Sequence, residues 1–178
     1  MLNVNYAEIK PRDIANGPGI RVSLFVSGCR HHCKGGFNPE TWSFDYGLPY
    51  TEETEKEILN LMEKDYIRGL SLLGGEPFEP ENQKGLLALV RKVRMRYPGK
   101  NIWSYSGYTL ERDILSGKLG QDAIDLLHEL DVLIDGEFHL EEKNPSLRFR
   151  GSGNQRVIDV KKTLARGQTV LWDESEAY

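Results

Sequence analysis

Short apolar segments alternate with helical segments along most of this chain, and this alternation restricts the possible folds more than any other feature of the sequence. Four segments rich in β-branched and other apolar residues are each followed by glycine or polar residues, which predicts buried strands. These predicted strands are residues 21–26, 70–73, 101–105 and 132–134. Helical patterns separate them at residues 51–62, 80–97, 109–115 and 121–130. The alternation predicts an α/β fold in which right-handed crossovers join parallel strands.

The four predicted strands end in residues that suit a binding site. Their carboxyl ends carry Gly28-Cys29, Gly74-Gly75, Ser106-Gly107 and Asp135-Gly136. Because the carboxyl ends of parallel strands lie at one edge of a sheet, these four segments are expected to converge. We therefore predict the functional site at that edge.

Composition and charge exclude several classes of protein. The chain has 178 residues, which fits a single domain over residues 1–178, and its 39% hydrophobic and 28% charged residues are typical of a globular protein. Lysine and arginine number 23 against 27 aspartate and glutamate residues, a formal net charge of −4. Without a basic excess to bind a phosphate backbone, nucleic acid is not expected as a partner.

The sequence shows no sign of a membrane segment. No apolar run approaches the roughly 18 residues that a membrane span needs. Residues 1–13 include Glu8, Lys10, Arg12 and Asp13 and lack the apolar core of a secretory signal. We expect a cytoplasmic protein with no membrane partner.

The chain has only two cysteines, Cys29 and Cys33, which are too few for a disulfide scaffold. They lie four positions apart, and His31 and His32 lie between them. Thiolates and imidazoles of this kind could bind zinc, and thiolates could hold part of an iron–sulfur cluster. Two free cysteines in a surface loop are a third interpretation, and the segment by itself leaves all three open.

Longer motifs surround the cysteine pair and continue along the chain. They occupy residues 16–21 (NGPGIR), 24–29 (LFVSGC), 37–42 (FNPETW), 74–77 (GGEP), 103–108 (WSYSGY), 132–136 (VLIDG) and 148–156 (RFRGSGNQR). The segment that begins at Cys29 resembles the cluster-binding loop of the radical S-adenosylmethionine (radical SAM) superfamily, whose cysteines are separated by three and then two residues. Within that superfamily, the ordered motifs resemble the activating proteins of anaerobic ribonucleoside-triphosphate reductases over nearly the whole chain.

The resemblance implies a fold and a reaction. It implies an incomplete, partial TIM-like barrel of parallel strands with an open side for the partner. Proteins of this family hold a 4Fe-4S cluster by three thiolates and bind S-adenosyl-L-methionine to the remaining iron. Reductive cleavage yields a 5′-deoxyadenosyl radical, which abstracts hydrogen from a glycine of the reductase large subunit. A reduced flavoprotein is the expected electron donor.

The resemblance also implies roles for individual residues. Cys29 and Cys33 would be cluster ligands, and no catalytic residue beyond the cluster is expected. The other implied contacts to S-adenosylmethionine comprise Lys34, Gly35, Gly36 and Phe37 on the adenine side, Gly74, Gly75 and Glu76 at the methionine amino group, and Ser104, Ser106 and Asp135 near the ribose or carboxylate.

One position departs from the family pattern, because Gly36 stands where the third cluster cysteine belongs. Glycine offers no side chain to iron, so this chain is expected to be impaired. We favour a substitution in an otherwise ordinary activating enzyme. The alternatives are a non-catalytic homologue that binds S-adenosylmethionine or the reductase, and a replacement ligand from His31, His32 or an external thiol.

Three further points concern the alternative functions, the two histidines and a polar group near the C-terminus. An activating enzyme of another glycyl-radical enzyme, such as pyruvate formate-lyase, is an alternative function, and a zinc protein is a less favoured one. Both histidines are expected to be solvated. The polar group Arg148, Arg150, Asn154, Gln155 and Arg156 either positions a partner loop or forms a solvated face.

Overall fold

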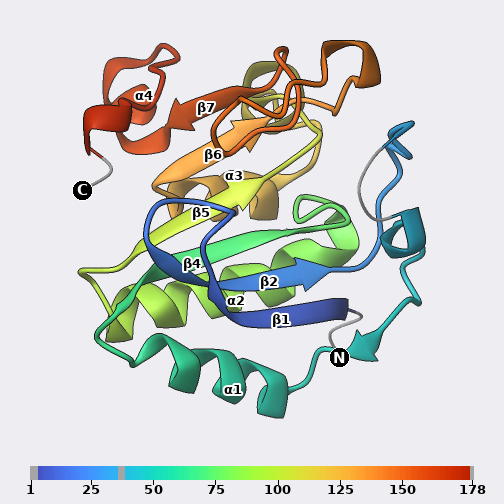
Figure 1. The fold of residues 1–178 in the computed structure, drawn as a ribbon. Coiled ribbons are helices and arrows are strands. Elements are labelled where there is room, and N and C mark those ends of the chain that lie inside the picture. The colour runs from blue at the N-terminus through green and yellow to red at the C-terminus, as the bar shows by residue number, and fades with distance from the viewer. Residues whose placement is uncertain (1–3, 36–38, 177–178) are drawn as a thin grey trace.

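The structure is a computed structural model that describes residues 4–35 and 39–176 (Figure 1). A seven-stranded sheet with the order β3-β1-β2-β4-β5-β6-β7 forms its centre. Its strands are β1 (Asn5–Asp13), β2 (Ile20–Val26), β3 (Leu48–Pro49), β4 (Ile67–Gly74), β5 (Asn101–Tyr105), β6 (Val132–Asp135) and β7 (Arg156–Asp159). The four predicted strands correspond to β2, β4, β5 and β6.

The strands of this sheet are parallel only in the middle. β2, β4, β5 and β6 pair in parallel, as predicted. The prediction of an all-parallel sheet is wrong for the outer strands, because β1 pairs antiparallel with β2 and β3, and β7 pairs antiparallel with β6. A turn over residues 14–19 joins β1 to β2 and is too short for a crossover helix. The sheet is mixed and open, with β3 and β7 at its edges.

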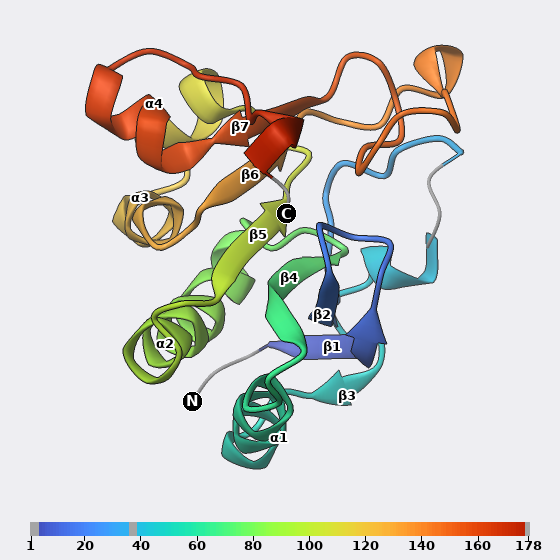
Figure 2. The ribbon, with the colours of Figure 1, turned by 60° about the vertical axis from the view of Figure 1, so that its left-hand side comes forward.

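The helices form one layer on one face of the sheet (Figures 1 and 2). The α-helices are α1 (Glu52–Met62), α2 (Pro80–Arg96), α3 (Gln121–His128) and α4 (Val160–Arg166); η2 (Leu110–Leu115) is a π-helix, and η1 (Pro39–Trp42), η3 (Leu140–Glu142) and η4 (Glu174–Glu176) are 3₁₀ turns. The central strands follow one another in one direction across the sheet, so right-handed crossovers place their helices on the same side. No helix within the described residues has the length and apolarity to cross a membrane.

Local sequence explains where the first helix begins. The N-cap residue of α1, Thr51, has extended backbone dihedrals, and its hydroxyl accepts a hydrogen bond from the Thr54 amide at 3.3 Å. The Thr54 hydroxyl in turn accepts a hydrogen bond from the Thr51 amide at 3.1 Å. This reciprocal capping satisfies two backbone donors that the helix itself leaves free.

The two faces of the sheet are packed differently. Between the sheet and the helices lies the main core, which includes Leu24, Leu72 and Leu133 from the central strands and Leu86 and Leu126 from the helices. A second, aromatic cluster centres on Trp103, Val132 and Ile134, and Tyr105, Phe149, Val157 and Trp172 pack against it. Within the described residues, no α-helix covers the opposite face, which is partly covered by loops.

A fully buried arginine fixes the turn between β1 and β2. Arg21 donates to Ser71 Oγ at 2.7 Å and to the carbonyls of Pro18 and Leu70 at 3.0 Å each. Ser71 Oγ donates to the Asn16 carbonyl at 2.6 Å. Burial lowers the pKa of Arg21 to about 10, so the side chain stays charged at neutral pH. These bonds hold Asn16 over the open face.

Ion pairs from Arg156 connect β6, β7 and η2, and they predict an acid-dependent stability. Arg156 donates to Glu111 at 3.0 and 2.7 Å and to Asp135 at 2.9 Å. Hydrogen bonds from Arg156 lower the pKa of Glu111 to about 2. Since the folded-state pKa is depressed, the stabilisation is complete above the unfolded value of about 4.3 and is lost as the pH falls towards about 2.

A Glu111→Gln variant is therefore expected to lose part of this acid dependence. Urea unfolding between pH 2 and pH 7 should show the wild type and the variant converging in stability at low pH. Glu53→Gln is the matched control, because the Glu53 side chain is 84% exposed and its contact with Lys56 is 3.7 Å long. A Glu111→Gln variant whose stability stays parallel to that of the wild type down to pH 2 would contradict the assignment.

Candidate cofactor site

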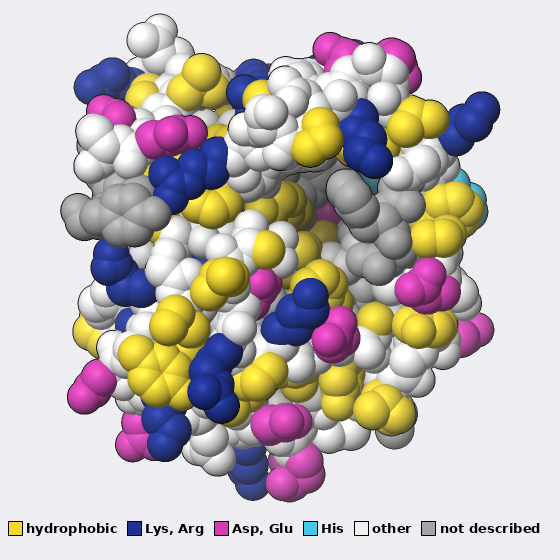
Figure 3. Space-filling model, viewed as in Figure 1, with side chains coloured by type: hydrophobic (Ala, Val, Ile, Leu, Met, Phe, Trp, Pro, Cys, Tyr) yellow, Lys and Arg dark blue, Asp and Glu magenta, His cyan; other side chains and the backbone are white. Residues whose placement is uncertain are grey.

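A cavity of about 390 Å³ lies at the carboxyl ends of the parallel strands, on the open face of the sheet. Figure 3 shows a hollow on this side of the molecule, with many apolar side chains on its floor. Six of the predicted site residues line the cavity: Cys29, Cys33, Gly74, Gly75, Glu76 and Ser106. The predicted convergence of the strand-end segments is confirmed for these residues.

Both cysteines are free thiols in this cavity, with Cys29 buried and Cys33 half-buried. The amides of His31 and His32 donate to the Cys29 sulfur, and the Phe138 amide donates to the Cys33 sulfur. Burial and, to a lesser extent, the charge of Glu76 raise the pKa of Cys29 to about 12. Burial likewise raises the pKa of Cys33. Both thiols are therefore protonated at neutral pH, and a bound metal has to displace these protons.

Glu76 joins three of the strand-end loops. Its side chain is 1% exposed and accepts hydrogen bonds from the Phe78 amide at 2.8 Å, the Ser106 hydroxyl at 2.8 Å and the Gly107 amide at 2.6 Å. His31 Nε2 lies 3.2 Å from Glu76 Oε1, an ion-pair contact with the cysteine loop. The Glu76 carboxylate, which was expected to bind the amino group of a ligand, is thus already engaged in contacts that connect the loops of the site.

Two glycines permit these loops to approach one another. A Cβ on Gly75 would lie 2.6 Å from the Gly28 carbonyl oxygen, and a Cβ on Gly107 would lie 2.7 Å from the His31 ring. The Glu76 amide donates to the Gly28 carbonyl at 2.8 Å across the same gap. A side chain at either glycine would push the cysteine loop away from its neighbours.

A second buried carboxylate, Glu79, anchors the other side of the cysteine loop. It accepts a hydrogen bond from the Arg30 amide at 2.8 Å and one from the Tyr108 hydroxyl. The Arg30 side chain contacts Glu79 at 3.1 Å and donates to Glu81 at 3.1 and 2.7 Å. Its guanidinium also lies 4.7 Å from the centre of the Phe44 ring. Backbone and side chain of Arg30 therefore tie the loop to the start of α2.

The prediction of two solvated histidines is wrong for His31. Its side chain is only 9% exposed, and its Nδ1 lies 2.8 Å from Glu137 Oε1. Burial lowers the pKa of His31, but the contacts with Glu76 and Glu137 outweigh it and raise the pKa to about 9. His32 stacks on Trp42, with ring centres 4.6 Å apart. His31 is therefore held by two carboxylates, whereas His32 is exposed, as predicted.

The remaining predicted site residues do not line the cavity or lie outside the described residues. Asp135 accepts bonds from Arg156 and from the Leu110 amide at 2.9 Å. The hydroxyl of Ser104, which is fully buried, donates to the Tyr105 carbonyl at 3.2 Å. Lys34 is exposed, and Gly35 lies against Leu140. Gly36 and Phe37 lie outside the described residues, so their roles stay predictions.

Comparison with known proteins decides the family. The family model described as a 4Fe-4S single cluster domain matches residues 15–158. An anaerobic ribonucleoside-triphosphate reductase-activating protein of Vibrio cholerae is 45% identical over 86% of this chain and 97% of its own length. The chain belongs to this activating-protein family. Two further proteins of the same description agree. The protein from Escherichia coli K12 is 42% identical over 89% of this chain and 100% of its own length. The protein from Enterobacteria phage T4 is 43% identical over 86% of this chain and 93% of its own length.

The donor set fits the cluster of the activating-protein family only in part. Two protonated thiols with amide donors to their sulfurs face one cavity, which suits iron–sulfur ligation. The chain has no third cysteine. His31 is held between two carboxylates, and His32 is stacked on Trp42. The chain therefore supplies two thiolates, one fewer than the three that the sequence resemblance implies.

Several cavity residues were missed by the sequence interpretation. They include Ala15, Asn16, Trp42, Tyr105, Phe149 and Gly151. Ala15 and Asn16 directly precede the Gly17-Pro18-Gly19 turn, so their position would have followed from predicting β1. Arg150 and Gln155 line the cavity, whereas Arg156 binds Asp135 and Glu111 instead.

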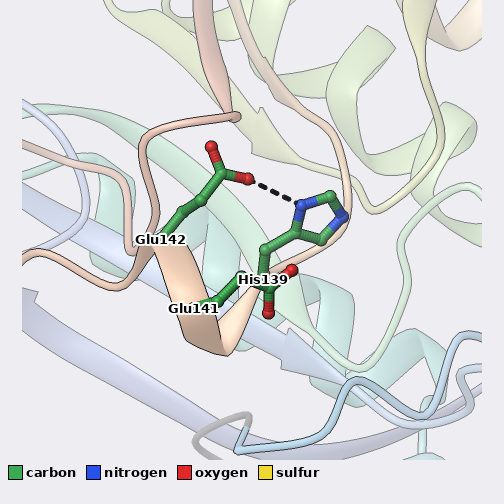
Figure 4. A group of neighbouring side chains, drawn as sticks. All are labelled: His139, Glu141 and Glu142. Atoms are coloured by element: carbon green, nitrogen blue, oxygen red, sulfur yellow. Dashed lines mark hydrogen bonds and ion pairs between the residues drawn. The ribbon is translucent and has the colours of Figure 1, made fainter.

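A group of possible metal ligands also lies outside the cavity. His139, Glu141 and Glu142 place one ligand atom each within 4.8 Å of one another (Figure 4). His139 Nδ1 already lies 2.8 Å from Glu142 Oε2, and both side chains are more than 40% exposed. These are ordinary properties of an exposed histidine–carboxylate pair, and the cysteine pair remains the candidate centre.

Proposed function

We propose that this chain acts as an activating protein of an anaerobic ribonucleoside-triphosphate reductase, generating its glycyl radical through reductive cleavage of S-adenosylmethionine. The observation that supports this most strongly is the placement of Cys29 and Cys33 with the Gly74–Glu76 segment in one cavity of a chain of this family. A bound 4Fe-4S cluster would supply the electron for the cleavage.

The residues of the chain have distinct parts in this proposal. Cys29 and Cys33 bind iron. The Gly74-Gly75 backbone and Glu76 receive the methionine end of S-adenosylmethionine, Ser106 and Asp135 support the ribose or carboxylate, and Gly35, Gly36 and Phe37 lie on the adenine side. The carboxylates of Glu76 and Glu79 hold the cysteine loop in place. The apolar part of the cavity wall, which includes Leu147 and Phe149, would limit the access of water to the reaction.

We further propose that residues 1–178 form one radical SAM domain whose open sheet is the incomplete barrel of that superfamily. The helix-free face would admit the glycine loop of the reductase, and a reduced flavoprotein would deliver the electron. Glycine at position 36 impairs the activity, because the iron that a cysteine at this position would bind lacks a protein ligand.

A non-catalytic homologue that binds S-adenosylmethionine or the reductase is the second candidate. The donor set favours it, since the chain has two thiols and the His31 imidazole is held between two carboxylates. Such a protein would keep the cavity and the partner surface but lose the redox step.

Anaerobic reconstitution of the chain with iron and sulfide separates the two candidates. Iron and sulfide content, electron paramagnetic resonance with and without S-adenosylmethionine, and radical formation on added reductase are measured on the same sample. A slow but detectable glycyl radical supports the activating function. Binding of the reductase without radical formation under any reducing condition supports the non-catalytic homologue, and a chain that binds neither iron nor reductase contradicts both.

A further inference from the structure

The C-terminal segment, residues 167–176, returns to the open face of the sheet after α4 (Figure 2). Leu171 forms an antiparallel bridge with Ile158, and the Trp172 amide donates to the Val157 carbonyl at 2.9 Å. The Asp159 amide donates to the Val170 carbonyl, also at 2.9 Å. The family model ends at residue 158, so this segment lies beyond the matched domain.

Trp172 of this segment completes a cluster of three aromatic rings. Its ring centre lies 4.9 Å from that of Trp103, with the planes at 80°, and 6.0 Å from that of Phe149. Phe149 and Trp103 are 5.3 Å apart at 81°. Trp103 makes edge-to-face contacts, which aromatic pairs prefer, with both other rings, whereas the planes of Phe149 and Trp172 are tilted at 59°. Phe149 therefore packs against Trp103 of β5 and against Trp172 of the C-terminal segment.

Phe149 also forms part of the cavity wall, together with Arg150 and Gly151. Its φ of +65° is in the left-handed region, which a bulky residue adopts only when its surroundings hold it there. Beyond Phe149, the Gln155 side chain holds the wall by accepting hydrogen bonds from the Gly151 and Ser152 amides at 2.8 and 3.1 Å. The Phe149 ring itself contacts Trp103 and Trp172, and the Arg148 guanidinium lies 4.7 Å from its centre.

We propose that Trp172 is a positioning residue that fixes the wall at Phe149–Gly151 and thereby sets how tightly the cavity binds S-adenosylmethionine. The statement about the ligand rests on the proposed function, whereas the statement about the wall rests on the aromatic contacts alone. Trp172 does not line the cavity, and it reaches the wall through its contacts with Phe149 and with Trp103, which packs on Phe149. A segment beyond the residues that the family model matches thus shapes the site.

Hydrogen–deuterium exchange of the metal-free chain tests the wall. Trp172→Ala is expected to raise amide exchange in peptides covering residues 147–153 by roughly fivefold or more, because the wall opens locally once the ring contact is lost. Leu171→Ala is the matched control, since Leu171 is the neighbouring residue and is 62% exposed. Trp172→Phe keeps an aromatic ring and should restore most of the protection. Unchanged exchange of the wall in Trp172→Ala would overturn the proposal.

Binding of S-adenosylmethionine to the reconstituted chain tests the consequence. The dissociation constant should rise roughly fivefold or more in Trp172→Ala, because local opening of the wall lowers the fraction of chains in the conformation that binds the ligand. It should stay unchanged in Leu171→Ala and return close to the wild-type value in Trp172→Phe. Faster exchange of the wall with unaltered affinity would also overturn the proposal. If the wild-type chain itself does not bind S-adenosylmethionine, the proposed function fails, and the exchange measurement still decides whether Trp172 fixes the wall.

Discussion

A Gly36→Cys variant, reconstituted anaerobically, is expected to hold about four irons per chain and to cleave S-adenosylmethionine at least about 100-fold faster than the chain with Gly36. The physical reason is the number of thiolates. Cys29 and Cys33 leave two irons of a cubane without protein ligands, whereas a third thiolate leaves one iron open for the substrate. Changing even the partners of metal ligands alters activity by roughly 10–100-fold, so supplying a missing ligand should have an effect of at least that size.

The control for this variant places a third thiol at the wrong spacing. Lys34→Cys adds a cysteine to the same loop at an exposed position next to Cys33, so it should raise neither iron content nor cleavage to the level of Gly36→Cys. Iron, sulfide and released 5′-deoxyadenosine are measured for both variants and for the unsubstituted chain. Equal cleavage by the unsubstituted chain and by the Gly36→Cys variant would refute the proposed impairment. Failure of both of these chains to bind iron would refute the cluster function.

The sequence predicted the parts of the sheet that are buried on both faces. In β5 the predicted and observed bounds agree, because Ile102, Trp103 and Tyr105 are residues typical of strands and glycine-containing turns bound the segment on both sides. β1 was missed because its residues are mostly half-buried and include four charged side chains among nine, so no apolar run marks it. β7 was missed because its four residues begin with Arg156 and end with Asp159. The direction of the outer strands then could not be predicted from the alternation of strands and helices.

The candidate site was predictable where its residues follow strand ends. Cys29, Gly74, Gly75 and Ser106 come directly after or at the ends of parallel strands, and topology alone brings them together. The role of His31 was not predictable, because its partner Glu137 lies 106 positions away in the chain. Contacts between residues so far apart in the sequence depend on how separate loops pack, and no local sequence pattern predicts that packing.

The contacts of Glu76 also depend on how separate loops pack. Removal of its carboxylate is expected to have the largest effect on stability of any substitution in the site. Glu76→Ala leaves the Phe78 and Gly107 amides and the Ser106 hydroxyl without their acceptor in a buried place. The expected loss is about 3 kcal/mol in the free energy of unfolding, since unsatisfied buried donors each carry a desolvation cost. Urea unfolding of the metal-free chain at pH 7 measures it.

Two further variants separate the hydrogen-bonding role of Glu76 from a general effect of charge near α2. Glu76→Gln keeps one acceptor oxygen and the size of the side chain, so it should cost about 1 kcal/mol. Glu81→Ala removes a partly exposed carboxylate that binds Arg30 and should change stability by less than about 1 kcal/mol. If all three variants unfold at the same urea concentration, Glu76 does not organise the strand-end loops. If Glu76→Ala is strongly destabilised and Glu81→Ala is not, the carboxylate that the sequence suggested for a ligand first serves to hold the cysteine loop against β4 and β5.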